Sequence, residues 1–142
     1  MAAIESSSSS LDAHLGELSY IIFFAQSNEH VSLFDWIGRE RADFQNFLKQ
    51  YPDTEYSDNA QFWIGECYYF EKNYEKAILE YDKVAKNYPD GDRVPYALLK
   101  QGLSFLNLGD KTGARLLLQQ VIKDYPNTNQ AKIARAKLLE IQ

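Results

Sequence analysis

The chain has 142 residues, 45% of them hydrophobic, which fits one globular domain. Its formal net charge of −5 argues against the basic surface that binding to nucleic-acid phosphates requires. A solvated acidic exterior is the first interpretation, and a preference for basic partners is the second. The single cysteine, Cys67, excludes an intrachain disulfide and a cysteine-based metal site.

Residues 1–10 are expected to form a flexible lead-in, because the serine run Ser6 to Ser10 has nothing to bury. The start lacks the basic region of a secretory signal. The only dense apolar run, Tyr20 to Ala25, is too short for a signal core or a membrane span. We therefore expect no export signal and no membrane insertion in the chain as given. A mature or truncated fragment of an exported protein would look the same.

The region from residue 11 to 50 predicts an atypical first helix pair, with helices over 11–25 and 29–50. The second helix carries an apolar stripe that is expected to face the core: Phe34, Ile37, Phe44, Phe47 and Leu48. Four aromatic residues form a possible N-terminal interface, which could also drive self-association: Tyr20, Phe23, Phe24 and Trp36. Two origins stay open, an altered first repeat and an engineered or rearranged start with a new binding interface.

Three Tyr-Pro pairs follow at a constant spacing of 37 residues, at 51–52, 88–89 and 125–126. A fixed period of this size is typical of stacked helical repeats, in which each unit buries its apolar face against its neighbours. The spacing predicts repeats over 51–87 and 88–124. Subtracting one more period from Gly65 and Ala77 leads to Asn28 and Glu40, which break the pattern.

Each repeat is predicted to hold two helices, over 58–70 and 74–87 in the first and over 95–108 and 111–124 in the second. Capping residues support these limits, with Asn73 before the second helix, Pro95 at the start of the third and Gly109-Asp110 before the fourth. A capping helix over 128–141 follows Thr128. Its outer side is polar, which suits the end of a stack: Lys132, Arg135 and Lys137.

Two mid-helix glycines at matched register, Gly65 and Gly102, predict a close approach of the paired helix, because glycine inside a helix costs about 1 kcal/mol relative to alanine. Ala77 and Ala114 are the expected facing residues.

These positions resemble the tetratricopeptide repeat. The first unit matches its glycine, aromatic, alanine and proline positions with Gly65, Tyr68, Tyr74, Ala77, Tyr81 and Pro89. The second unit matches with Gly102, Phe105, Gly109-Asp110, Ala114, Leu118 and Pro126, and it departs at Lys111, where tyrosine is usual. The resemblance implies an all-α solenoid of stacked antiparallel helix pairs that binds proteins without catalysis.

Segments such as FQNFLKQYPDTEYSDNAQFWIGE resemble, more narrowly, the C-terminal domain of the periplasmic Tol–Pal coordinators of cell division. Outer-membrane assembly lipoproteins are a weaker match. The resemblance covers about residues 43–140 and implies a periplasmic scaffold with a TolA-like partner. The coiled coil that precedes the repeats in that family is missing here, and the serine run resembles part of its linker.

No constellation for catalysis, metal or cofactor binding is evident. His14 and His30 have no third ligand at metal spacing, and Cys67 lies at the register of Ser104, which indicates a small packing residue. The carboxylates of Glu66 and Glu71 fit solvated helix faces better than an acid–base pair. We therefore expect no enzyme and no cofactor.

The resemblance places the peptide-binding groove on the first helix of each repeat. The first unit contributes Asn59, Phe62, Trp63, Glu66, Tyr69 and Phe70, and the second contributes Tyr96, Leu99, Lys100, Leu103 and Leu106. Such a surface suits a peptide with apolar anchors. For Phe62, Leu99 and Leu103 a place in the inter-repeat core is the equal alternative. Phe62 and Glu66 stand where a lysine and asparagine clamp would hold a terminal carboxylate, so that ligand class is not expected.

Overall fold

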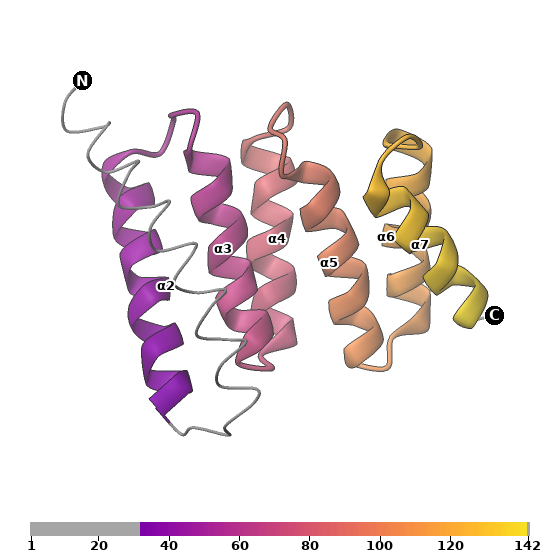
Figure 1. Ribbon diagram of the computed structural model, residues 1–142, viewed down its shortest axis with the longest axis horizontal. Helices are drawn as coiled ribbons and strands as arrows, with labels where there is room; N and C mark the ends of the chain where they lie inside the picture. Colours follow the sequence, from indigo (N-terminus) through magenta and orange to yellow (C-terminus); the bar gives the residue numbers. More distant parts are fainter. Residues whose placement is uncertain (1–31, 142) are drawn as a thin grey trace.

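The computed structural model describes residues 32–141, and within this range every regular element is a helix. In chain order the helices are α2 (Ser32–Gln50), α3 (Ser57–Phe70), α4 (Tyr74–Asn87), α5 (Val94–Asn107), α6 (Lys111–Asp124) and α7 (Asn129–Glu140). They stand in a row from α2 to α7 (Figure 1), with α3 packed on α4, α5 on α6, and α7 at the end. The predicted all-α solenoid of helix pairs with a C-terminal capping helix is confirmed.

The Tyr-Pro pairs end the helices α2, α4 and α6. Proline disfavours helical geometry in the residue before it, and Tyr88 and Tyr125 leave the helix with nearly the same angles, φ −133° and ψ 58° against φ −133° and ψ 55°. The Tyr88 hydroxyl also donates a hydrogen bond of 2.7 Å to the carbonyl of Pro52 in the preceding turn. The 37-residue period is therefore a repeat of backbone geometry.

The turns inside the two pairs are also equivalent. Asn73 and Asp110, 37 residues apart, cap α4 and α6 by accepting from the amides of Lys76 and Gly113 at 3.4 and 2.9 Å. The residue before each cap is left-handed, with φ +62° at Lys72 and φ +82° at Gly109. Glycine adopts this geometry freely and lysine does so at a cost. The predicted caps are confirmed, including Thr128 at the start of α7.

Two clusters of buried side chains form the core. The larger joins α3 to α7 and includes buried residues of α4 and α6, with Tyr81, Val84, Leu118 and Val121 fully buried. The smaller joins α2 to α3 around Ile37, Phe44 and Cys67. Burial raises the pKa of the Cys67 thiol to about 12, so the thiol stays protonated and serves packing, as its register with buried Ser104 predicts.

The residues that face the two glycines differ from the prediction. A Cβ on Gly65 would lie 2.6 Å from the Tyr81 ring, and one on Gly102 would lie 3.0 Å from Leu118 Cδ2. Ala77 and Ala114 are fully buried, but they lie one helical turn before these contacts. The predicted close approach at the two glycines is therefore confirmed, and the space without a Cβ is filled by the large side chains of Tyr81 and Leu118.

Helix α2 differs from the prediction in the exposure of Phe34 and in its relation to the repeat register. Phe34, predicted in the core, is 52% exposed. Arg41 pairs with Glu71, the residue after α3, so the first turns of α2 extend beyond the end of α3 (Figure 1). Conversely, Glu40 is buried at the register of Ala77, and Phe44 and Phe47 are buried at those of Tyr81 and Val84. The repeat register thus continues into α2. The predicted lead-in 1–10, helix 11–25 and residues 29–31 lie outside the described residues.

Candidate functional site

The first helices of the two repeats, α3 and α5, share one surface on which the predicted groove residues meet. We call it the α3–α5 face. Its members are Asn59, Phe62, Trp63, Glu66, Tyr69 and Phe70 of α3, and Tyr96, Leu99, Lys100, Leu103 and Leu106 of α5. Contacts between the helices join its two halves, including ring contacts between Phe62 and Tyr96 with centroids 6.2 Å apart.

Lys100 lies at the centre of this face. Its ammonium is 3.6 Å from the centroid of the Tyr69 ring and 3.5 Å from Glu66 Oε1, so it links α5 to α3 by a cation–π contact and an ion pair. Asn107 approaches the Tyr69 hydroxyl at 3.3 Å from the same helix. Burial raises the pKa of Tyr69, which therefore stays neutral and offers a polar tip on an apolar ring.

The Glu66 carboxylate lies behind the surface. It is buried, and its Oε1 accepts a hydrogen bond of 2.5 Å from the hydroxyl of Tyr81 on α4. Two donors from neighbouring helices thus compensate one buried charge. Sequence reasoning placed Glu66 among the residues that a peptide touches, and the structure places it instead in a polar contact between three helices.

Arg93 marks the other end of the face and was missed by sequence reasoning. Its guanidinium lies 5.2 Å from the Phe62 centroid and 5.1 Å from that of Tyr96, and its Nε donates to Asn59 Oδ1. Its position two turns before Lys100, just ahead of α5, was the available signal. An arginine stacked on two rings presents a fixed cation to a partner.

The predicted groove residues divide by depth. Phe62 and Leu99 are buried in the larger cluster, so the core alternative holds for both, and Leu103 packs partly buried against it. Partly buried side chains form most of the remaining surface: Asn59, Trp63, Tyr69, Phe70, Lys100 and Leu106. Tyr96 is 41% exposed. The accessible surface is therefore narrower than predicted and richer in aromatic rings.

The possible N-terminal interface is only partly described. Tyr20, Phe23 and Phe24 lie outside the described residues. Trp36 is partly buried against the cluster of Ile37 and Phe44, so only part of its ring faces outward. A new interface at this end stays a prediction.

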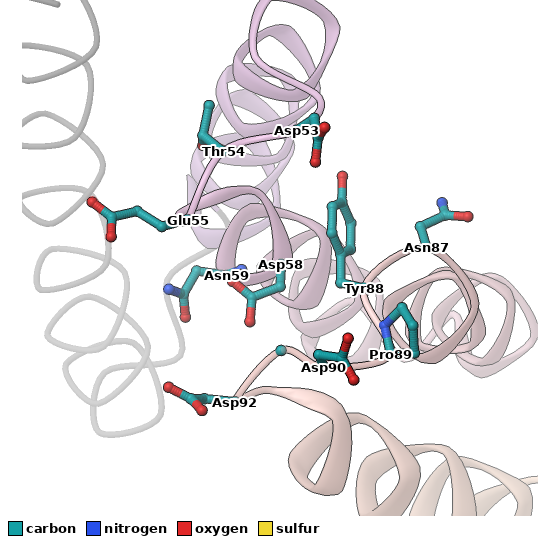
Figure 2. A pocket seen from close by; sticks show the side chains of 11 residues that line it. Asp53, Thr54, Glu55, Asp58, Asn59, Asn87, Tyr88, Pro89, Asp90 and Asp92 are labelled. Carbon is teal, nitrogen blue, oxygen red and sulfur yellow. Dashed lines mark hydrogen bonds between the residues drawn. The ribbon is translucent and has the colours of Figure 1, made fainter.

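A pocket of about 380 Å³ lies where the two inter-repeat turns meet, and it was not predicted. Figure 2 shows acidic side chains around it from both turns: Asp53, Glu55, Asp58, Asp90 and Asp92. Asp58 is held by the backbone amides of Asn59 and Arg93. Asp53 and Glu55 recur one period later as Asp90 and Asp92, a repeat that sequence analysis could have used.

Residues 32–141 contain no group of three or more histidine, cysteine or carboxylate side chains arranged to hold a metal ion. None of the helices from α2 to α7 is both long and apolar enough to cross a bilayer.

Comparison with known proteins agrees with this architecture. The family described as Tetratricopeptide repeat matches residues 59–91 and 96–128, whose starts are 37 residues apart. These matches begin inside α3 and α5, eight residues after the predicted repeat starts at 51 and 88. No curated protein matches the chain. Residues 59–91 and 96–128 thus match the tetratricopeptide repeat within an all-α helical-repeat fold, and repeats of this family generally serve as protein–protein interaction modules.

Proposed function

We propose that the α3–α5 face is the concave groove of this module and that it binds an extended or helical segment of a protein partner. The observation that carries the proposal is the arrangement around Lys100 of α5, whose ammonium lies against the Tyr69 and Phe70 rings of α3 and helps to hold both rings in place. Rings fixed before binding lose little conformational freedom when a partner covers them, which favours affinity.

The partner that best fits this surface has apolar anchors spaced for a groove. Tyr96, Tyr69 and Phe70 present ring surface, and the cationic side chains of Arg93 and Lys100 are held against these rings. Apolar side chains of a peptide would pack between the rings, and the peptide backbone would accept hydrogen bonds from donors on the α3–α5 face that are not engaged within the chain.

The cellular role that we propose is that of a Tol–Pal scaffold in the bacterial periplasm, which coordinates envelope constriction through a TolA-like partner. The support is the similarity of residues 43–140 to the repeat domain of those coordinators. The acidic pocket between the turns adjoins the α3–α5 face at Asn59, which lines both, and it is not needed for this role.

Titration of purified TolA into the protein by calorimetry tests both parts. The variant Tyr96→Ala with Phe70→Ala removes one ring from each helix, and we expect a loss of at least about tenfold in affinity. The control Leu79→Ala with Leu116→Ala removes exposed leucines from α4 and α6 and is expected to bind normally. Unchanged binding by the ring variant would contradict the groove. No binding by the unaltered protein would remove the Tol–Pal role and leave the interaction module.

A further inference from the structure

Helix α7 has a side that no helix of the described residues covers. In the repeats, α3 is paired with α4 and α5 with α6, whereas α7 packs on α6 and, to a smaller extent, on α5. At the register of Gly65 and Gly102, which admit the paired helix, α7 carries Leu139, and this leucine is 73% exposed. A helix therefore cannot approach α7 as α4 approaches α3.

The uncovered side of α7 has a symmetric pattern about Ala136, which is itself exposed. Three residues away on either side are Ile133, 44% exposed, and Leu139. Four residues away on either side are two exposed charges of opposite sign, Lys132 and Glu140. On a helix with 3.6 residues per turn, these five positions lie on one face, centred on the small residue.

We propose that this face pairs with the same face of a second copy, so that two α7 helices lie antiparallel about a two-fold axis through Ala136. Such an axis brings each residue opposite the one equally far from Ala136 on the other copy. Leu139 then meets the second copy's Ile133, and Lys132 meets its Glu140. A self-complementary patch is what a two-fold interface requires.

The chemistry of the paired positions is complementary throughout the contact. Ala136 meets its own copy at the axis, where a small side chain lets the helices come close. Along the helix, Ile133 and Leu139 lie three positions from Ala136 and the charged residues four, so the ion pairs form the outer layers of the contact. The contact between Lys137 and Glu140 within one chain, 3.3 Å long and exposed, is weak enough to yield to Lys132 of the second copy.

Arg135 and Lys137 would also come opposite each other, but they stand about 100° from the centre of the contact on a helix with 100° per residue. Arg135 is also engaged within its own chain, with the carbonyl of Pro126. Their like charges therefore stay outside the contact.

The interface is small, because a helix of this length is only about 18 Å long. We expect a reversible dimer with a Kd on the order of 0.1 mM. Sedimentation velocity over a hundredfold range of concentration measures it directly.

Charge reversal gives the decisive test. Lys132→Glu alone and Glu140→Lys alone each place like charges opposite each other at two symmetric sites, and each is expected to weaken association on the order of tenfold. An equal mixture of the two variants restores both attractive pairs and is expected to sediment as a heterodimer. A mixture that associates no better than its components would overturn the two-fold arrangement.

A second variant tests the apolar contact. Leu139→Glu is expected to abolish the dimer, whereas Leu116→Glu, at a leucine of α6 that is 63% exposed, leaves it intact. Both positions face solvent in the single chain, so thermal melting of diluted samples is expected to stay unchanged. Association that persists in Leu139→Glu, or an unaltered protein that remains monomeric throughout the concentration range, would contradict the proposal.

Discussion

Gly65 determines how deeply Tyr81 enters the space between α3 and α4. Tyr81 is fully buried, and its ring lies where any Cβ at position 65 would be, 2.6 Å from Cδ1 and from Cε1. The hydroxyl end of the ring is held by Glu66, so the ring is fixed at both ends. Such a ring cannot move aside without breaking that hydrogen bond.

Gly65→Ala is therefore expected to lower the free energy of unfolding by about 2–3 kcal/mol, because overpacking outweighs the gain of about 1 kcal/mol in helix propensity. Urea denaturation measures the change. Gly102→Ala is the matched comparison, since its Cβ would meet the more adaptable Leu118 at 3.0 Å. We expect that variant to lie within about 1 kcal/mol of the unaltered protein. Equal losses at the two glycines would show that ring fixation is unimportant.

Sequence reasoning found these glycines but not the residues that they admit. A period gives the register of each position, and matched glycines within it indicate close approach. The partner across the helix pair depends on how far one helix slides along the other, which the period does not contain. Likewise, the burial of Phe34 depends on where α3 ends beside α2, and Phe34 is exposed because α3 ends first.

At the scale of the elements, a polar contact joins the three helices α3, α4 and α5. Glu66 of α3 accepts from Tyr81 of α4 and pairs with Lys100 of α5. One period later, the first two positions hold Leu103 and Leu118. The two repeats thus use different chemistry at one register, a buried polar contact in the first and an apolar one in the second.

Tyr81→Phe is expected to lower stability by about 2 kcal/mol, because the buried carboxylate loses its short hydrogen bond while keeping its charge. Urea denaturation of Tyr81→Phe, Glu66→Leu and the double variant measures the coupling. We expect Glu66→Leu to be less harmful in the Tyr81→Phe background. Additive losses would contradict the coupling.

The same hydroxyl predicts a dependence on pH. Burial, and then the charge of Glu66, raise the pKa of Tyr81 well above its usual 10. The unfolded chain begins to lose the Tyr81 proton near pH 10, and the folded protein does not. The contribution of the Tyr81 hydroxyl to the free energy of unfolding is therefore complete below pH 10 and declines above it. In the Tyr81→Phe variant, the alkaline decline in stability is expected to be smaller.

Element boundaries were the part of the fold that the sequence predicted best. The caps Asn73, Asp110 and Thr128 and the Tyr-Pro pairs act through local backbone geometry, which needs no knowledge of distant contacts. The division of the α3–α5 face into surface and core was harder. Phe62, Leu99 and Tyr96 all belong to the α3–α5 face. Phe62 and Leu99 are buried and Tyr96 is exposed, and only the packing of neighbouring helices decides which of these positions is covered.

At the scale of the whole molecule, the two core clusters are joined by a few side chains of α3. Trp63 and Tyr68 pack against both, and Arg41 of α2 lies over the Tyr68 ring at 4.4 Å. In repeat proteins each unit contacts only its neighbours, so cooperativity depends on such junctions. The attachment of α2 to the repeats therefore depends on α3 side chains that serve both clusters.

Trp63→Ala is expected to uncouple α2 from the later helices, because it removes a large ring from both clusters while removing no side chain of α5, α6 or α7. We expect amides of α2 and α3 to exchange with solvent at least about tenfold faster, and those of α5 and α6 to keep their protection. Native-state hydrogen exchange measures both in one sample. Leu116→Ala, which removes an exposed leucine of α6, is the control and is expected to change neither group. If amide exchange in Trp63→Ala were faster by the same factor along all of residues 32–141, the row of helices would open as one unit, with no weaker junction at α3.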